Sequence, residues 1–111
     1  MNTETYIITI VEDFSKHPYG RYVTDGNASG EKFRRELLAP KLRQHEKVHV
    51  NLDGYNRYGR SFLDEAFGGL IREEGFTGDD LRRKLTYSHS LIKSLNKVIA
   101  ERIEAAENSR E

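Results

Sequence analysis

The stretch "KVHVNLDGYNRYGRSFLDEAFGGLIREEG", residues 47–75, contains the residue patterns of a strand, a polar loop and a helix in succession. Apolar and polar residues alternate from residue 48 to residue 52, and this period of two predicts a strand that ends at Asp53. From about residue 61 to residue 74 the apolar residues recur at helical spacing, and Gly75 is placed to cap the C-terminus of this helix. A strand, a loop and an amphipathic helix in this order are typical of α/β layer folds.

The sequence before this unit predicts two shorter strands and a second helix. Tyr6–Val11 alternates and is rich in β-branched residues, and "RYVT" (residues 21–24) predicts a short strand before a hairpin-type turn at Asp25-Gly26. Ser29 is a favoured N-cap for a helix with one apolar face. Pro40 lies inside that helical pattern and predicts a kink or a break.

The sequence after the unit predicts one more strand between two helices. "TGDDLRRKL" (residues 77–85) indicates a short helical turn, and "KLTYSH" (residues 84–89) indicates a short strand. Apolar residues at helical spacing from Leu91 to Ile103 predict the last helix, with Ser88 or Ser90 near its start.

Together these patterns predict an α/β fold: a small layered domain with about four strands in a mixed sheet and helices packed on it. The chain contains no internal repeat and no interdomain linker, so residues 1–111 are expected to form a single domain. The polar segment 105–111 is expected to fray.

The composition limits the classes of function. The 111 residues are enough for one hydrophobic core, and the absence of cysteine excludes disulfides and zinc sites built on cysteine. No apolar run approaches the roughly 18 residues of a membrane span, and the N-terminus lacks the basic region of a secretory signal. We therefore expect a cytoplasmic location without membrane contact.

The charges and the histidines exclude further classes. The net charge is zero, which argues against a dedicated nucleic-acid binder. Residues 1–15 and 61–80 are acidic and residues 16–60 and 81–111 are basic, a distribution that favours solvated faces over partner surfaces. Four histidines are present, but His45 and His49 lie on either side of a predicted change from helix to strand. We expect no metal site and no cofactor.

Three segments of the chain resemble a known family. "HPYGRYVTDGNASGEKFRRELLAPKL", the strand "VHVNLDG" and the block "SFLDEAFGGLIRE" are similar to the STAS-like family of small bacterial and archaeal domains of unknown function. The resemblance covers roughly residues 12–90. It implies the fold of the wider class of STAS domains, which includes sulfate-transporter and anti-sigma-factor-antagonist domains. In that class a kinase of the histidine-kinase-like ATPase type phosphorylates a serine in the first turn of a helix, and the antagonist then releases its partner.

The resemblance assigns roles to individual positions. Asp53 matches the acidic residue at the end of the central strand, and Ser61 matches the phosphorylatable serine. Gly68-Gly69 match the small residues of the helix that follows. Arg60 departs from the pattern of the antagonists, which carry Asp immediately before the serine.

Ser61 has two interpretations from the residues alone. As an N-cap it would form a capping box with Asp64. As a phosphorylation site it would place a phosphate at the positive end of the helix dipole beside Arg57 and Arg60, against repulsion from Asp64 and Glu65. The residues favour the cap. A serine-hydrolase elbow is excluded because the residue two positions after the serine is Leu and not Gly.

Two further groups of residues are candidate sites. Arg21 and the helix start at Ser29-Gly30 form a possible anion site, although a structural Arg21 that pairs with Asp25 or Asp53 is the favoured alternative. A loop that mixes aromatic and basic residues is typical of protein interfaces and, less often, of single-strand nucleic-acid binding; its residues are Tyr55, Arg57, Tyr58 and Arg60. Gly68-Gly69 predict the close approach of a sheet or of a partner.

Three functional hypotheses follow. The first is a non-enzymatic regulatory domain that binds a protein through Tyr55, Arg57, Tyr58, Arg60, Asp64 and Glu65. The resemblance implies an ATPase-type kinase that phosphorylates Ser61 as one such partner. The alternative is a nucleic-acid-associated or defence-linked protein that uses the loop Tyr55–Arg60 and the basic segment 81–97. The third is an enzyme with a pocket that joins Ser61, Asp53 and Arg21.

Overall fold

The three strands of the sheet are parallel and lie side by side in the order in which they occur in the sequence. The computed structural model describes residues 4–110, with β1 at Thr5–Thr9, β2 at Lys47–Asn51 and β3 at Leu85–Ser88. Ile8 of β1 lies opposite Val50 of β2, and Val50 lies opposite Tyr87 of β3. The predicted strand at residues 47–52 is therefore confirmed as the central strand.

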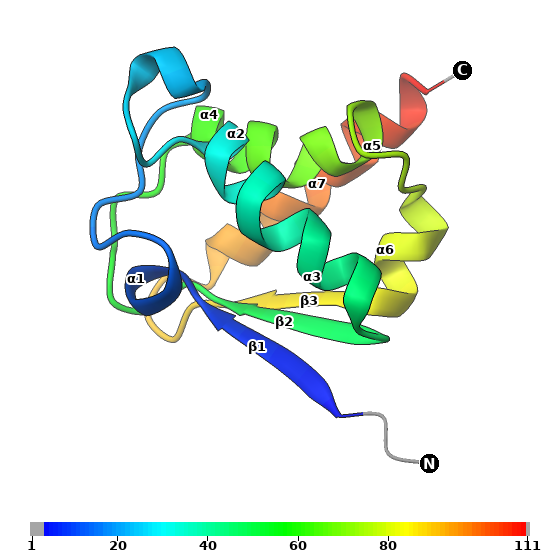
Figure 1. Ribbon diagram of the computed structural model, residues 1–111, viewed down its shortest axis with the longest axis horizontal. Coiled ribbons are helices and arrows are strands. Elements are labelled where there is room, and N and C mark those ends of the chain that lie inside the picture. Colours follow the sequence, from blue (N-terminus) through cyan, green and yellow to red (C-terminus); the bar gives the residue numbers. More distant parts are fainter. Residues whose placement is uncertain (1–3, 111) are drawn as a thin grey trace.

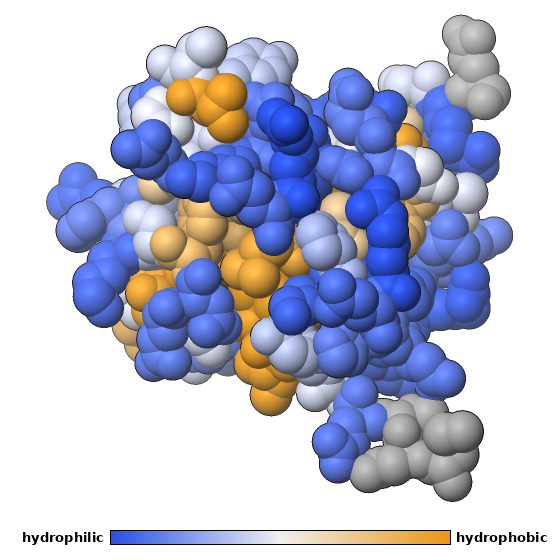
Figure 2. Space-filling view, in the orientation of Figure 1, coloured by the Kyte–Doolittle hydropathy of each residue, from blue (hydrophilic) through white to orange (hydrophobic). Residues whose placement is uncertain are grey.

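The alternation of side chains along the strands separates a core face from an open face. Ile8, Val48 and Val50 are fully buried, while Ile7 on the other face of β1 is 58% exposed. Figure 1 shows the long helices on one side of the sheet. Figure 2 shows apolar surface over β1, surrounded by hydrophilic side chains. This arrangement is unusual because parallel sheets are normally covered on both faces.

The first long helix runs without a break from Gly30 to Gln44. It consists of α2 (Gly30–Phe33), the π-helical segment η2 (Arg34–Leu38) and α3 (Ala39–Gln44). Ser29 caps it as predicted, because its Oγ accepts a hydrogen bond from the Lys32 N–H at 3.1 Å. The predicted break at Pro40 is wrong. Pro40 is the second residue of α3, just after the widened turn, in the first turn of an α-helical segment, where a helix tolerates the missing N–H.

The second long helix also contains a π-helical segment. It consists of α4 (Arg60–Leu63), η3 (Asp64–Gly68) and α5 (Gly69–Arg72). The Gly69 N–H donates to the Asp64 carbonyl, five residues back, and this bond defines the widened turn. Gly75 has φ +86°, in the left-handed region expected of a residue that ends a helix.

The C-terminal part places two helices beside β3. α6 (Gly78–Lys84) begins with a capping box in which Thr77 and Asp80 exchange hydrogen bonds. α7 (Ser94–Asn108) begins later than predicted. It remains helical beyond residue 105, with Ala106 buried, and the last residue of the expected frayed tail, Glu111, lies outside the described residues.

The prediction of a fourth strand and a mixed sheet is not confirmed. Residues 21–24 form no strand; the short 3-10 helix η1 (Val23–Asp25) occupies this region, and α1 (Ile10–Asp13) follows β1 directly. Tyr22 and Val23 are about half exposed. Their β-branched and aromatic pattern therefore buries no face, and nothing pairs with it to form a strand.

The hydrophobic core lies between the sheet and the two long helices. Phe33 and Phe62 stack at 5.9 Å between ring centroids and are almost fully buried, as is Phe67. None of the helices between residues 4 and 110 is long and apolar enough to cross a membrane.

Candidate functional site

The loop that follows β2 and the first turn of the helix after it carry most of the residues that the sequence singled out. Asp53 lies two residues after the end of β2, and His89 and Ser90 come directly after β3. Both positions lie at the carboxyl end of a parallel sheet, which is where ligands usually bind in open α/β folds.

Asp53 holds the end of β2 to the segment after β3. Its Oδ1 accepts a hydrogen bond from the Ser90 N–H at 2.6 Å, and its Oδ2 accepts one from the Ser90 hydroxyl at 2.7 Å. These two hydrogen bonds lower the pKa of Asp53. The structure thus explains why α7 does not begin at Ser90: the backbone and side chain of Ser90 bind Asp53.

His89 fixes the beginning of the loop. Its side chain is buried, its Nδ1 accepts hydrogen bonds from the N–H groups of Leu91 and Ile92, and its Nε2 lies 2.9 Å from the Tyr55 carbonyl oxygen. These contacts suit the tautomer with its proton on Nε2. His89 Nδ1 also lies 3.5 Å from Asp53 Oδ1.

The two tyrosines of the loop pack against the domain. Tyr55 and Tyr58 are in a T-shaped arrangement with ring centroids 5.1 Å apart, and Tyr58 also packs against Phe62 and His89. The Tyr58 hydroxyl is buried without a hydrogen-bond partner among the described residues, and burial raises the pKa of Tyr58. Tyr58 is therefore an anchor for the loop, and its ring is not free for base stacking.

Arg57 near the end of the loop and Arg60 and Ser61 at the start of α4 form an exposed group of side chains. All three residues are exposed, and none of their side chains makes an ion pair or a hydrogen bond within residues 4–110. The predicted cap at Ser61 is wrong. The N-cap is Gly59, whose carbonyl accepts the hydrogen bond of the Leu63 N–H. Ser61 lies in the first helical turn, and its hydroxyl has no hydrogen-bond partner among residues 4–110.

Asp64 and Glu65 face away from this exposed surface. Asp64 Oδ2 lies 2.7 Å from Arg21 Nη1 and 3.2 Å from Arg72 Nη2, and Glu65 Oε2 lies 2.7 Å from Arg34 Nη1. Burial disfavours the charged carboxyl of Asp64, but the hydrogen bond from Arg21 and the charge of Arg72 outweigh it and lower the pKa of Asp64. The structure therefore places both predicted partner-binding carboxylates in an internal network of ion pairs.

The sequence analysis missed Arg34, which lies at the centre of that network. Its side chain is only 3% exposed and donates to Glu65 and to Glu74. Arg34 precedes Leu38 by four residues and therefore shares the apolar face of its helix. A basic residue at such a position, with an unpaired acid in the facing helix, is the signal that would have identified it.

The predicted anion site at Ser29-Gly30 is occupied by the protein's own backbone. The Gly30 N–H donates to the Gly20 carbonyl at 2.9 Å, and the Glu31 N–H donates to the Arg21 carbonyl at 3.0 Å. The Lys32 N–H donates to the Ser29 hydroxyl, so the first three N–H groups of the helix are already bound and do not bind an anion. Arg21 has the favoured structural role, but its guanidinium pairs with Asp64 and Glu65, and only its backbone N–H donates to Asp25.

The paired glycines allow close contacts inside the molecule. A Cβ on Gly68 would lie 3.2 Å from the Arg102 carbonyl oxygen of α7, and a Cβ on Gly69 would collide with the guanidinium of Arg34. The neighbours are thus a helix and a buried arginine of the same chain, where the sequence predicted a sheet or a partner.

The remaining candidate residues are dispersed. In the segment 81–97, Arg82 and Arg83 pair with Asp79 and Asp80 of the same helix. His45 stacks on Tyr6, whereas His49 lies on the open face of the sheet with its ring nitrogens 2.7 and 2.8 Å from the hydroxyls of Thr86 and Ser88.

Comparison with known proteins identifies the family. No significant match to a curated protein or to a solved structure was found. A family model matches residues 29–90, more than half of the chain, which includes both long helices, the central strand and the loop at its carboxyl end. The chain therefore belongs to the family described as "STAS-like domain of unknown function (DUF4325)".

Proposed function

We propose that the protein is a non-enzymatic regulatory domain of the cytoplasm that binds a protein partner through the exposed residues Arg57, Arg60 and Ser61, here called the loop surface. The observation that carries this proposal is that two guanidinium groups and a serine hydroxyl lie together in sequence, exposed and without partners within residues 4–110. Arginine is enriched at interface hot spots.

Several contacts hold the loop surface in place. This favours binding, because the loop then loses little conformational entropy when a partner binds. Two hydrogen bonds join Asp53 to Ser90, one joins His89 to the Tyr55 carbonyl, and Tyr58 is packed on Phe62. The partner surface is expected to be acidic, so that it pairs with Arg57 and Arg60.

The finer proposal is that phosphorylation of Ser61 by a histidine-kinase-like ATPase controls this binding, as in the wider STAS class. A phosphate on Ser61 would lie in the first turn of the helix 60–72, next to Arg60 and near free backbone N–H groups. Repulsion from the carboxylates of Asp64 and Glu65 opposes a phosphate on Ser61. Both carboxylates are directed toward arginines, which reduces that repulsion.

The test uses the full chain isolated from its native cell. Phosphosite mapping is expected to find phosphate on Ser61. Affinity purification is expected to recover a partner with the wild-type chain and with Ser61→Ala. With Ser61→Asp the amount of recovered partner is expected to decrease at least tenfold. Ser94→Asp is the matched control, since Ser94 is also an exposed serine in the first turn of a helix. Absence of phosphate under every growth condition, with both Ser61 variants behaving as wild type, would remove the switch.

The interface itself has a separate test. The double variant Arg57→Glu/Arg60→Glu is expected to lose the partner, whereas Lys97→Glu, an exposed charge reversal on α7, is expected to keep it. If the double variant binds as wild type, the partner does not use the loop surface.

The same two arginines provide the one observation in favour of the nucleic-acid alternative, because exposed guanidinium groups also bind phosphates. Titration of a fluorescent single-stranded 20-mer at several salt concentrations distinguishes the two. A steep fall of affinity with salt favours nucleic acid, and the absence of binding at low salt rejects it.

A further inference from the structure

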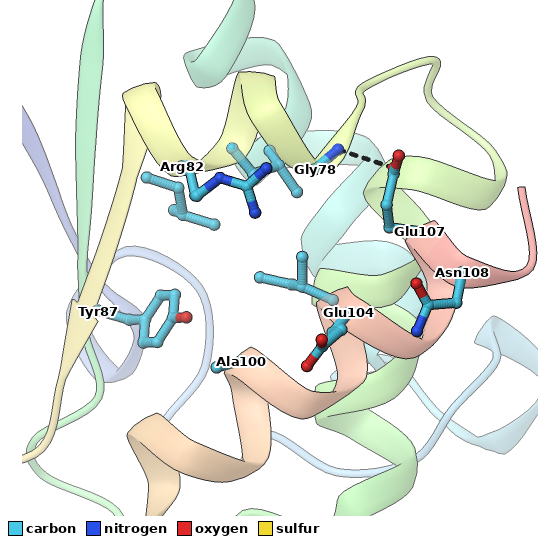
Figure 3. Close-up of a pocket in the computed structure, with 10 residues that line it drawn as sticks. Gly78, Arg82, Tyr87, Ala100, Glu104, Glu107 and Asn108 are labelled. Carbon is cyan, nitrogen blue, oxygen red and sulfur yellow. Dashed lines mark hydrogen bonds between the residues drawn. The ribbon is translucent and has the colours of Figure 1, made fainter.

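A cleft lies between β3 and the two C-terminal helices, away from the loop surface. Its volume is about 570 Å³. Figure 3 shows the residues that line it, with the Tyr87 ring directed into it from β3, Arg82 directed into it from α6, and Glu104 on α7. Its apolar lining comes from Leu81, Leu85, Tyr87 and Ile103. A cleft of this size has room for a few side chains of a ligand.

The cleft opens beside a free strand edge. β3 pairs with β2 on one side only. The Ser88 carbonyl accepts the hydrogen bond of the Leu52 N–H, so Ser88 directs its backbone polar groups toward β2. The polar groups of adjacent residues in a strand point to opposite sides, and the N–H and C=O of Tyr87 therefore point away from the sheet. In the described part of the chain no residue bonds them.

The free edge and the cleft together specify the shape of an occupant. An extended chain that pairs with β3 lies about 4.8 Å from it and directs every second side chain to the face on which Leu85 and Tyr87 lie. That face is the side of the cleft. An added strand would therefore satisfy the Tyr87 backbone groups and insert alternate side chains into the cleft.

The charges at the rim specify the chemistry of the occupant. Glu107 is already bound, because its carboxylate accepts hydrogen bonds from the Gly78 N–H and from Arg110. Arg82 is likewise paired, with Asp79. Glu104 is exposed and makes no ion pair with any residue from 4 to 110. The unpaired charge of the rim is thus negative, and its complement is a Lys or Arg side chain.

We propose that this cleft binds an extended peptide segment of another protein, which adds to β3 as a fourth strand. The peptide inserts an apolar side chain against Leu81 and Ile103 and directs a Lys or Arg, two residues away, toward Glu104. A second copy of the chain is a poorer occupant. The inward side chains of its own β3, Leu85 and Tyr87, already line its own cleft, and Leu85 is only 6% exposed. This inference is independent of the loop surface.

The experiment begins with selection from a phage-displayed library of random dodecapeptides on the full wild-type chain. Selected peptides are synthesised and titrated into the ¹⁵N-labelled protein. Two pairs of variants separate the cleft from the rest of α7. Ala100→Trp fills the cleft, and Ala105→Trp places the same ring at another exposed alanine. Glu104→Lys reverses the rim charge, and Glu101→Lys reverses an exposed charge outside the cleft.

The expected peptides carry an apolar residue and a basic residue two positions apart, and bind with a Kd in the micromolar range. Bound peptide is expected to slow hydrogen exchange of the Tyr87 amide, which directly reports strand addition. Ala100→Trp and Glu104→Lys are expected to weaken binding at least tenfold, with Ala105→Trp and Glu101→Lys unchanged. Circular dichroism of each variant checks that it is folded.

Three results would overturn the proposal. The first is that no peptide binds more tightly than about 100 μM. The second is that bound peptide leaves the exchange of the Tyr87 amide unchanged. The third is self-association of the wild-type chain that Ala100→Trp abolishes, which would make a second copy the occupant.

Discussion

The guanidinium of Arg34 and the carboxylate of Glu65 lie 2.7 Å apart between the two long helices, with 3% and 8% of their side chains exposed. Arg34 is the first residue of the π-helical segment η2, and Glu65 belongs to the π-helical segment η3. The two widened turns thus meet at a buried ion pair. Glu74 and the Glu65 carbonyl accept the remaining hydrogen bonds of Arg34.

Replacement of Glu65 alone is expected to destabilise the fold strongly. In Glu65→Ala the buried guanidinium of Arg34 loses one of its two carboxylate partners. Removing one partner of a buried ion pair costs about 3–5 kcal/mol. We expect a loss near the lower value, because Glu74 still pairs with Arg34. Urea denaturation measures the free energy of unfolding.

Two controls accompany this substitution. Arg35→Gln removes the exposed pair with Glu31 and is expected to cost less than about 0.5 kcal/mol. The double variant Arg34→Met/Glu65→Met is expected to be more stable than Glu65→Ala, because no charge remains buried without a partner. If the double variant is the least stable of the three, the pair contributes net stability and this account of its energetics is wrong.

Gly69→Ala is expected to destabilise the protein, although alanine normally stabilises a helix by about 1 kcal/mol relative to glycine. The new Cβ would collide with the Arg34 guanidinium and displace it from Glu65. Thermal unfolding of Gly69→Ala in the wild-type and Arg34→Ala backgrounds forms a double-mutant cycle. In the Arg34→Ala background the substitution should be neutral or stabilising; an equal loss in both backgrounds would contradict the proposed collision.

The beginning of the second long helix offers a test of the cap. Gly59 is the N-cap, and as a glycine it has no side chain to accept a capping hydrogen bond. Its φ is −83°, and a Cβ added to it would have no atom within 4 Å. Gly59→Ser is therefore expected to stabilise the protein by a few tenths of a kcal/mol. Ser61→Ala should leave the free energy of unfolding unchanged. A loss of about 1 kcal/mol in Ser61→Ala would restore Ser61 as the cap.

Stability is expected to decrease in acid because the carboxylates of the network are bound in the folded state. Burial opposes ionisation of Asp64 and Glu74, yet arginine partners lower the pKa of each: Arg21 and Arg72 for Asp64, and Arg43 and Arg34 for Glu74. A depressed folded-state pKa stabilises the protein above the unfolded values of 3.8 and 4.5, and this contribution disappears as the pH falls through the folded values.

The measurement is the urea midpoint from pH 7 to pH 2.5. The urea midpoint of the wild-type protein is expected to decrease once the pH is lowered below about 4.5. The urea midpoint of Asp64→Asn is expected to depend less on pH. Carboxyl NMR gives an independent check at Glu107. Hydrogen bonds from Arg110 and the Gly78 N–H lower the pKa of Glu107 to about 2. A urea midpoint that does not change between pH 6 and pH 3 would contradict the stabilising role of the Asp64 and Glu74 carboxylates.

Local patterns along the chain predicted the secondary structure well where burial and pattern agree. Val48 and Val50 alternate because one face of β2 is buried, and the strand lies where the period of two placed it. The exposed residues around Val23 have strand-like composition without a buried face, and they form a 3-10 turn. The same local reasoning predicted a kink or a break at Pro40, but the helix continues through this residue because Pro40 lies in the first turn of α3, just after the widened turn.

The sequence by itself determined the class of fold, the central strand, the loop that leaves it and the family. The fold class, the strand and the loop depend on periodicity and turn chemistry between near neighbours in the chain, whereas the family follows from the resemblance of three segments to known sequences. Only the tertiary structure decided the partners of the charged side chains, because Arg34 and Glu65 are thirty-one residues apart and Arg21 and Asp64 forty-three. Such pairs form only after the helices pack, and packing removed Asp64 and Glu65 from the surface while it left Arg57, Arg60 and Ser61 exposed.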